Sequence, residues 1–219
     1  MIGGVHSIEL LLDPSADAAV REEWSVLSAA GLHSLGEHQG ATNAPHLTLL
    51  AKPRIGPGDD DALREIVARA LPLPVQLGAP LVFGVGRRGL VLVRSVVPTA
   101  ALLALHRAVH EQLGRDGEAA VDHTAPDAWT PHVTLARRLA PAGVATALEA
   151  LADAAASRAA GQDEEARGGT GPSPASPGPA LSNARRWDSD AREVTDLGPA
   201  RAPAGGPSDD ARPQDDGGR

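Results

Sequence analysis

An internal repeat constrains this sequence more than any other feature. Residues 45–52, Pro-His-Leu-Thr-Leu-Leu-Ala-Lys, align with residues 131–138, Pro-His-Val-Thr-Leu-Ala-Arg-Arg. Both copies read Pro-His-aliphatic-Thr-Leu and carry a cation six residues after the histidine. The two histidines lie 132 − 46 = 86 positions apart. This separation is long enough for each copy to belong to its own lobe of strands and helices.

The period of a β-strand determines what each copy can present. Residues two apart share a face of a strand, so His46 and Thr48 point the same way, as do His132 and Thr134. The intervening aliphatic residues point to the opposite side, where they can be buried. Each copy therefore offers an imidazole and a hydroxyl on one face. A pseudo-two-fold axis would bring the two faces together across a cleft.

Two imidazoles across a phosphate suit cleavage of a phosphodiester without a metal ion. A neutral histidine takes a proton from the attacking water or hydroxyl, and a protonated one delivers a proton to the departing oxygen. An unperturbed histidine pKa near 6.5 lets both forms coexist around neutral pH. Threonine hydroxyls can donate hydrogen bonds to the phosphoryl oxygens, where charge develops in the transition state.

The tetrads His46–Leu49 and His132–Leu135, with the strand and helix order around them, resemble the 2H phosphoesterases. The closer resemblance is to the bacterial 2′-5′ RNA ligase / RNA 2′,3′-cyclic phosphodiesterase branch, and it covers roughly residues 5–160 and 185–197. It implies an α+β fold with two pseudo-symmetric lobes of antiparallel sheet plus helices around a central cleft. It also implies metal-independent opening of 2′,3′-cyclic phosphates to 2′-phosphates, with reversible, ATP-independent 2′-5′ ligation in some members.

Carried over residue by residue, the resemblance makes His46 and His132 the catalytic acid/base pair. Which of them is the acid and which the base stays open. Thr48 and Thr134 become the residues that hold the substrate phosphate. No cofactor and no metal ion is implied.

Three cations follow the tetrads and are further candidates for phosphate binding. Arg137 stands five residues after the second histidine, where some family members have an arginine. Strict alternation puts Arg138, and not Arg137, on the face of His132, so either a bulge turns Arg137 inward or Arg138 serves instead. Lys52 occupies the six-residue position in the first copy.

Composition limits the substrate more than the reaction. The chain has 20 basic and 28 acidic residues, a net charge of −8, which argues against coating nucleic acid through bulk charge. Trp129 and Phe83 are the candidate base-stacking residues. We therefore expect a small nucleotide or an RNA end carrying a cyclic phosphate, and no DNA. The alternatives are a cyclic phosphodiesterase for a small metabolite such as ADP-ribose cyclic phosphate, and a non-catalytic nucleotide or RNA-end binding module.

Other chemistries lack the residues they need. The chain has no cysteine, which excludes thiol catalysis and Cys-ligated zinc. Lys52 is the sole lysine and is followed by proline, so no P-loop is present. His106 and His110 are spaced i, i+4 on a predicted helix, but the amphipathic pattern of that helix accounts for them better than a metal does.

The sequence also predicts how the chain is divided. Residues 1–160 and 183–198 form the phosphoesterase-like domain, and residues 183–198 supply a terminal strand or hairpin. The Gly-, Pro- and Ser-rich segments 161–182 and 199–219 are predicted to be a disordered insertion and tail. No apolar stretch approaches the roughly 20 residues of a membrane span. We expect a cytoplasmic monomer.

Local patterns predict individual elements within the domain. We expect strands at 5–12, 32–35, 47–51, 75–85, 90–97 and 133–139, with 75–85 and 90–97 forming a hairpin around Gly86-Arg87-Arg88-Gly89. We expect helices at 16–30, from 59 to 70, from 98 to 113 and at 141–156. His6, on the first strand, could face the cleft.

Overall fold

A computed structural model describes residues 4–38, 40–84, 89–168 and 178–198, without the side chains of residues 162–168. Its sheet has the order β3-β7-β1-β2-β6-β5-β4, with β8 paired to β7, and the strand pairs within it are antiparallel. The strands are β1 (His6–Leu12), β2 (His46–Lys52), β3 (Leu73–Pro74), β4 (Leu77–Phe83), β5 (Leu90–Val96), β6 (His132–Leu139), β7 (Ala180–Asp188) and β8 (Glu193–Asp196).

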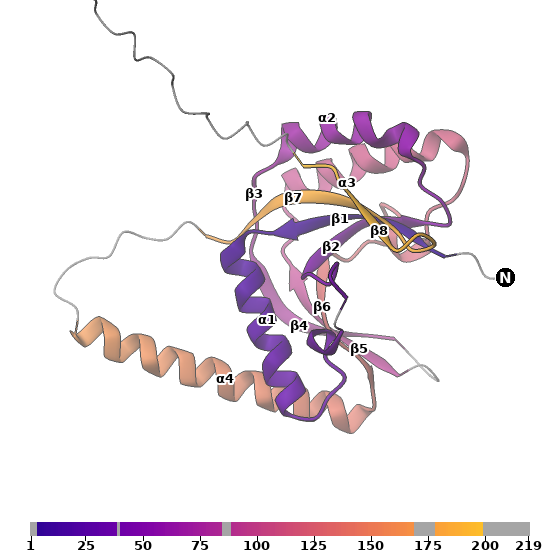
Figure 1. The fold of residues 1–219 in the computed structure, drawn as a ribbon. Helices are drawn as coiled ribbons and strands as arrows, with labels where there is room; N and C mark the ends of the chain where they lie inside the picture. Colours follow the sequence, from indigo (N-terminus) through magenta and orange to yellow (C-terminus); the bar gives the residue numbers. More distant parts are fainter. Residues whose placement is uncertain (1–3, 39, 85–88, 169–177, 199–219) are drawn as a thin grey trace, which may run out of the picture.

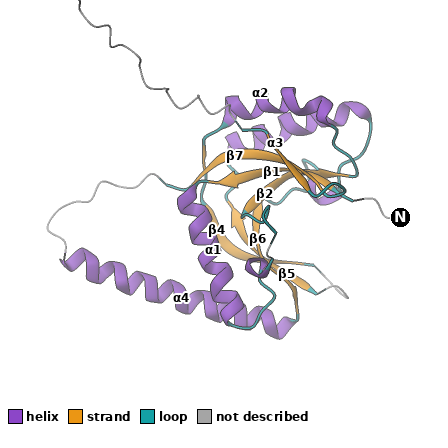
Figure 2. Ribbon diagram, in the orientation of Figure 1, coloured by secondary structure: helices purple, strands orange, loops and turns teal. Residues whose placement is uncertain are grey.

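Helices cover this sheet (Figure 2). They are α1 (Pro14–Ala29), α2 (Asp60–Ala70), α3 (Ala100–Leu113) and α4 (Pro141–Gly168), together with four 3₁₀ turns, η1 (Leu35–Glu37), η2 (Pro57–Asp59), η3 (Gly114–Asp116) and η4 (Asp122–Thr124). The expected α+β class is confirmed. None of the helices in the described ranges has the length and apolar character that crossing a membrane requires.

The strand order relates the two lobes by a pseudo-two-fold arrangement. Figure 1 shows α2 and α3 on one side of the sheet and α1 and α4 on the other. The sheets of the lobes meet where β2 pairs with β6 through Leu47 and Val133, both fully buried. Moving outward, β1 and then β7 follow β2, while β5 and then β4 follow β6. The unit β1-α1-β2 thus corresponds to β5-α3-β6. The helices are exchanged between the lobes, since α1 packs against β6 and α3 packs against β2.

The core explains the strand and helix periods of the sequence. Leu47, Leu49, Val133 and Leu135 are buried, as strand alternation predicts. Helix α1 begins after Asp13, whose side chain accepts hydrogen bonds from the backbone N–H groups at positions 15 and 16. Its buried residues recur at helical spacing and are Ala16, Val20, Trp24 and Leu27. Burial of this stripe is the main source of stability for such a helix.

Helix α2 shows a role that the sequence did not reveal. Asp59, Asp60 and Asp61 do stand at its start, where negative charge favours the macrodipole. Asp60, however, is buried and forms a bidentate pair with Arg186 of β7, at 2.8 and 2.9 Å. Because a bidentate arginine–carboxylate pair is geometrically specific, this contact fixes α2 against β7.

Several element boundaries differ from the sequence predictions. The segment 32–35 forms no strand but a single bridge between Ser34 and Ala136, followed by η1. The segment 75–85 contributes β4, and β3 precedes it. Its pairing with β5 confirms the hairpin, although residues 85–88 of the turn lie outside the described residues.

The C-terminal part contains more regular structure than expected. Helix α4 continues to Gly168 and β7 begins at Ala180, so both elements extend into the predicted insertion 161–182. The long helix reflects its alanine-rich sequence, because alanine has the highest helix propensity. Residues 169–177 and the predicted tail 199–219 lie outside the described residues. The hairpin predicted in 183–198 is present as β7 and β8.

Candidate active site

One cavity brings the two repeats together. It has a volume of about 470 Å³, and its lining includes His46 and Thr48 from β2 and His132 and Thr134 from β6. The four side chains come from the two central strands of the sheet. The pairing of β2 with β6 therefore achieves what the strand period predicted, two imidazoles and two hydroxyls at one cleft.

The two histidines make the same local hydrogen bond. The Nδ1 of His46 lies 2.8 Å from the carbonyl oxygen of Ala44, and the Nδ1 of His132 lies 2.6 Å from that of Thr130. A carbonyl oxygen can only accept, so Nδ1 carries a proton in both rings. This bond fixes the orientation of each imidazole and leaves Nε2 for proton transfer.

The carbonyl oxygens of the two threonines each accept a hydrogen bond from a tryptophan, although Trp24 lies on α1 and Trp129 lies in the segment before β6. The indole N–H of Trp24 donates to the carbonyl oxygen of Thr134, and that of Trp129 donates to the carbonyl oxygen of Thr48, both at 3.0 Å. Each His-x-Thr strand is thus tied to a tryptophan from outside that strand. These bonds restrain the backbone at the position that aims each threonine hydroxyl.

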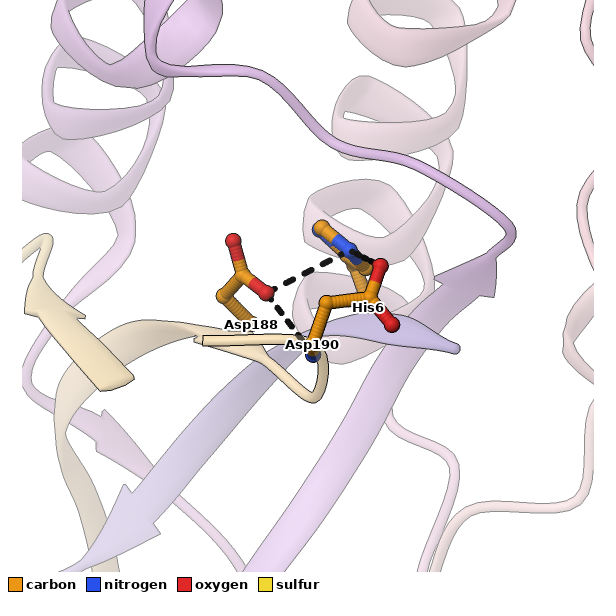
Figure 3. A group of neighbouring side chains, drawn as sticks. All are labelled: His6, Asp188 and Asp190. Carbon is orange, nitrogen blue, oxygen red and sulfur yellow. Dashed lines mark hydrogen bonds and ion pairs between the residues drawn. The ribbon is translucent and has the colours of Figure 1, made fainter. Parts of the chain in front are cut away.

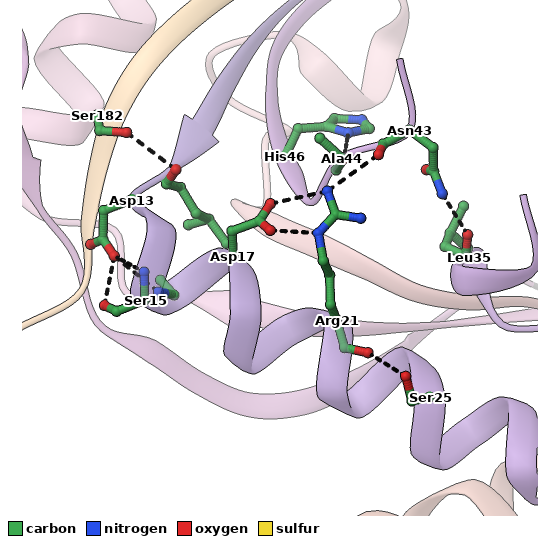
Figure 4. A network of polar contacts seen from close by, with 12 residues as sticks. Asp13, Ser15, Asp17, Arg21, Ser25, Leu35, Asn43, Ala44, His46 and Ser182 are labelled. Atoms are coloured by element: carbon green, nitrogen blue, oxygen red, sulfur yellow. Dashed lines mark hydrogen bonds and ion pairs between the residues drawn. The ribbon is translucent and has the colours of Figure 1, made fainter. Parts of the chain in front are cut away.

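Helix α1 also anchors the loop that precedes His46 (Figure 4). The guanidinium of Arg21 pairs with Asp17 one turn earlier and donates to the carbonyl oxygen of Asn43 at 3.3 Å. The Asn43 amide donates in turn to the carbonyl oxygens of Leu35 and His38, at 2.8 and 2.9 Å. The loop is therefore fixed immediately before the carbonyl that orients His46.

A charged group stands beside His46. The carboxylate of Glu9, on β1, has Oε1 at 3.6 Å from Nε2 of His46. Arg185, on β7, donates from Nε to Oε2 of Glu9 at 2.7 Å, and the Ser7 hydroxyl donates to Oε1 at 2.8 Å. Glu9 is only 5% exposed. All three residues line the cavity with His46.

The surroundings of His132 are different. The Phe83 ring meets it edge to face, with centroids 4.9 Å apart. Burial lowers the pKa of His132 below its usual value, and the neighbouring positive charges of His123, His46 and Arg137 act in the same direction, against the hydrogen bond to Thr130. His132 therefore tends toward the neutral form that a proton acceptor requires.

A second cavity adjoins the first on the side of His132. It has a volume of about 910 Å³ and shares His123, His132, Thr134 and Arg137 with the first cavity. Its other walls come mainly from the ends of β4 and β5 and the segment before β6. The cleft thus has space on both sides of the second histidine.

A bulge decides between the two arginines that follow His132. In the ladder with β5, Thr134 pairs with Val93 and Ala136 pairs with Leu92, so β6 carries an extra residue there. The alternation shifts as a result. Arg137 lines both cavities, and Arg138 lines the second cavity only. The structure thus places Arg137 in the same cavities as His132, because the bulge changes the alternation that would otherwise point Arg137 away.

The structure does not bring Lys52 to the cleft, which corrects its assignment as a phosphate-binding candidate. Its side chain is 1% exposed, and Nζ donates to the carbonyl oxygen of Leu113 at 2.9 Å and to the Asp116 carboxylate at 2.7 Å. Strand β2 has the same bulge as β6, because Thr48 pairs with Glu9 and Leu50 pairs with Ile8. The residue that it turns to the first cavity is Ala51, the counterpart of Arg137, and Lys52 does not line that cavity. Lys52 instead joins β2 to the C-terminal end of α3, where a cation is favourable.

The two aromatic candidates lie at the cleft in different settings. Trp129 lines the first cavity, but one face of its indole is stacked on His106, with centroids 3.9 Å apart and planes 8° from parallel. Phe83 lines the second cavity. One face of Trp129 is therefore covered by His106, and the Phe83 ring packs against the His132 ring.

His106 and His110 are held by protein groups. The Nε2 of His106 lies 3.0 Å from the carbonyl oxygen of Thr124, and that of His110 lies 3.3 Å from that of Leu49. Burial lowers the pKa of His106 to about 4, and the charge of His110 adds to this effect. Nε2 is the donor in both rings, so the pair joins α3 to β2 and to the turn η4.

His6 does not face the cleft, unlike the expectation for the first strand. It forms a cluster with Asp188 and Asp190 (Figure 3), at 3.5 and 3.4 Å from Nε2. The three groups are close enough to hold a metal ion. The Nδ1 of His6, however, accepts from the backbone N–H of Ile55 at 3.3 Å. Nε2 must then carry the proton that faces the carboxylates, so the cluster is explained as an anchor for the β7–β8 turn.

The residues of the cleft that sequence reasoning missed include Ser7, Glu9 and Arg185, together with His123, which lines both cavities. A signal for the first two was present, because they alternate with apolar residues in a strand that is otherwise apolar from Ile8 to Leu12. A polar face on a strand buried between two neighbours indicates a site. Arg185 gave no comparable signal, since its partner lies 176 positions earlier.

Comparison with known families identifies the relatives of this chain. The family model described as the 2′-5′ RNA ligase superfamily matches residues 13–164, which include both tetrads. The chain belongs to the 2′-5′ RNA ligase superfamily. This membership confirms the resemblance that the two His-x-Thr tetrads indicated. A comparison with curated proteins gives no match.

Solved structures similar to this superfamily member include three with low sequence identity. TT0787 of Thermus thermophilus is 19% identical, with a TM-score of 0.48 over 89% of this chain and 95% of that one. A phosphoesterase is 16% identical, with a TM-score of 0.45 over 88% and 94% of the two chains. LigT of E. coli, complexed with 3′-AMP, is 16% identical, with a TM-score of 0.43 over 87% and 92%.

Proposed function

We propose that this chain is a metal-independent phosphodiesterase that hydrolyses 2′,3′-cyclic phosphate ends of RNA or nucleotides to 2′-phosphates. The observation that carries the proposal is the matched pair of histidines in one cavity. Each has Nδ1 bonded to a backbone carbonyl and Nε2 left for proton transfer. Membership in a superfamily of 2′-5′ RNA ligases supports the same chemistry. Reversible, ATP-independent 2′-5′ ligation is the same step with the 5′-hydroxyl of a second RNA end attacking phosphorus in place of water.

In the proposed mechanism one imidazole removes a proton from water as the oxygen attacks phosphorus. The other donates a proton to the ribose O3′ as the P–O3′ bond breaks, which leaves a 2′-phosphate. Thr48 and Thr134 donate to the phosphoryl oxygens, and Arg137 adds a positive charge from the edge of the same cavity. These groups are in place before substrate binds, so little reorganisation is needed.

The cleft favours a nucleotide or a chain end as substrate. The cyclic phosphate would lie between the histidines, and the second cavity, beside Phe83, gives room for a base or a neighbouring nucleotide. Among the described residues, Arg137, Arg138 and Arg185 are the arginines that line the two cavities. They provide local charge for a phosphate although the whole chain has a net charge of −8.

The proposal is tested by turnover of a panel of cyclic phosphates with EDTA present. The panel contains 2′,3′-cyclic mononucleotides, oligonucleotides ending in a 2′,3′-cyclic phosphate and ADP-ribose cyclic phosphate. We expect EDTA-resistant hydrolysis of the first two, lost in His46→Ala, and the matched control His33→Ala retains it because His33 is exposed and outside both cavities.

Two other results would redirect the proposal. Faster turnover of ADP-ribose cyclic phosphate than of any nucleotide would assign the site to a small metabolite. Binding of a 2′-phosphate without turnover of any cyclic phosphate would make the chain a non-catalytic binding module. Undiminished turnover in a variant lacking both cleft histidines would refute the mechanism.

A further inference from the structure

The two lobes place different residues beside the equivalent histidines. Glu9 pairs with Thr48 in the β1–β2 ladder, and Val93 pairs with Thr134 in the β5–β6 ladder. Glu9 and Val93 therefore occupy corresponding positions of the pseudo-two-fold arrangement. One is a carboxylate and the other an apolar side chain, and both are buried. The symmetry of the site is broken at this position.

The contacts of Glu9 are those of an ionised carboxylate. Oε2 accepts from Arg185 at 2.7 Å and Oε1 accepts from Ser7 at 2.8 Å. Arg185 is itself held in place by donating to the carbonyl oxygen of Thr42 at 2.8 Å. A cation and a hydroxyl donor stabilise the charged form of a buried carboxyl group. Glu9 is also the sole acidic residue among the described residues that line either cavity.

Hydrogen-bonding rules then distinguish the two imidazoles. His46 has a proton on Nδ1, because its partner there is the Ala44 carbonyl, and Nε2 lies 3.6 Å from Glu9 Oε1. A lone pair on Nε2 would face a negative oxygen, whereas an N–H would be attracted to it. His132 has the same proton on Nδ1 but no carboxylate at the corresponding place. Its Nε2 can keep a lone pair without repulsion.

We propose that Glu9 is a positioning residue that holds His46 as the proton donor and leaves His132 as the proton acceptor. This inference rests on the proposed phosphodiesterase function. The water oxygen bonds to phosphorus and its proton passes to Nε2 of His132. The P–O3′ bond breaks and O3′ takes the proton from Nε2 of His46. At 3.6 Å Glu9 attracts this N–H without a hydrogen bond, so the proton stays available to the substrate.

The charge state of the histidines can be measured without any turnover. In ¹⁵N-histidine NMR spectra at pH 7, assigned with His46→Gln and His132→Gln variants, we expect a cation-to-neutral ratio about tenfold higher for His46 than for His132. In Glu9→Gln the ratio for His46 should fall toward that of His132. The matched control is Glu23→Gln, which removes another largely buried arginine-paired glutamate, here paired with Arg94. It should leave both ratios unchanged.

Turnover with two leaving groups tests the assignment chemically. A cyclic nucleotide with sulfur in place of O3′ has a leaving group that needs little protonation. We expect Glu9→Gln to lower kcat about tenfold or more on the oxygen substrate and less than about threefold on the sulfur one. His46→Ala should be rescued by sulfur in the same way, and His132→Ala should not.

The outcomes separate the inference from the function on which it rests. If the wild type turns over neither substrate, the proposed function fails, and the NMR comparison of His46 with His132 in the wild type still decides the charge assignment. Equal ratios for the two histidines would overturn the role of Glu9. Rescue of His132→Ala by sulfur would reverse the donor and acceptor. An equal loss in Glu9→Gln on both substrates would reduce Glu9 to a structural residue.

Discussion

Strands β2 and β6 carry the same tetrad and the same supporting bonds, yet their neighbours differ. Each strand presents a histidine fixed through Nδ1 and a threonine whose carbonyl accepts from an indole. Next to β2 lies Glu9 of β1, which is paired with Arg185 of β7, whereas next to β6 lies Val93 of β5. The repeat therefore supplies two equivalent His-x-Thr strands, and the neighbouring strands give the two histidines different electrostatic surroundings.

The largest expected effect concerns the histidines, which we expect to act as a unit. His46→Ala and His132→Ala should each lower kcat by about 10³-fold, within the 10²–10⁴ range of general acid–base catalysis. The double variant should be little worse than either single variant, because both protons move in one step. Steady-state kinetics on a 2′,3′-cyclic nucleotide measure this. Multiplicative losses would mean that the two imidazoles act independently.

A second difference between the lobes is a pH dependence of stability that arises beside α3. The pKa of His106 is lowered to about 4 in the folded protein, against an ordinary value near 6.5 in the unfolded chain. The unfolded state therefore binds more protons between these values. The stabilisation is complete above pH 6.5 and is lost as the pH falls toward 4, by about 3 kcal/mol.

Urea unfolding at a series of pH values measures this loss. His106→Gln should flatten the dependence between pH 6.5 and 4, and His33→Gln, at an exposed position, should not. The α1 side has no corresponding buried pair of histidines among the described residues of that helix. An unchanged slope in His106→Gln would place the titrating group elsewhere.

Of the cations that follow the two tetrads, we expect Arg137 to affect activity and Lys52 to affect stability. Arg137→Ala should lower kcat/KM by about 10²-fold, as expected for loss of one charge-stabilising group, with little change in stability because its side chain is exposed. Lys52→Met should leave kcat/KM nearly unchanged, since Lys52 lies outside both cavities. It should lower the free energy of unfolding by about 1–3 kcal/mol, through the unpaired Leu113 carbonyl. A large activity loss in Lys52→Met with an intact fold would contradict this division.

The smallest expected effect tests the symmetry itself. Trp24→Phe and Trp129→Phe each remove one indole bond to a threonine carbonyl, and each should lower the free energy of unfolding by about 1–2 kcal/mol. Similar losses would support equivalent roles for the two tryptophans. Chemical denaturation gives the two values. A loss confined to one variant would show that only one of the two bonds supports its strand.

The sequence allowed much of this architecture to be predicted. Strand alternation predicted that Leu47 and Val133 would be buried while the histidines shared a face with the threonines, and helical spacing predicted the buried stripe of α1. These predictions are confirmed because side-chain direction within one element depends on local geometry alone. Element ends were less predictable, as α4 shows by continuing to Gly168.

The site could be predicted only where it was repeated. Two equal copies revealed the histidines and threonines, but single residues such as Glu9 and Arg185 have no copy to compare with. Lys52 shows the opposite failure, because it matches Arg138 in spacing from its histidine and still turns into the interior. Its destination depends on the Leu113 carbonyl and Asp116, which lie 61 and 64 positions away.

By itself the sequence determined the groups that we propose as reactive, two imidazoles and two hydroxyls, each pair on one face of a strand. Only the tertiary structure decided which charges surround them. The bulge in β6 brings Arg137 to the cleft. The pairing of β1 with β2, and of β7 with β1, brings Glu9 and Arg185 to His46. The physical reason is that the direction of a side chain follows from the local geometry of its own strand. The electrostatic field at a side chain depends instead on neighbours that come from distant parts of the sequence.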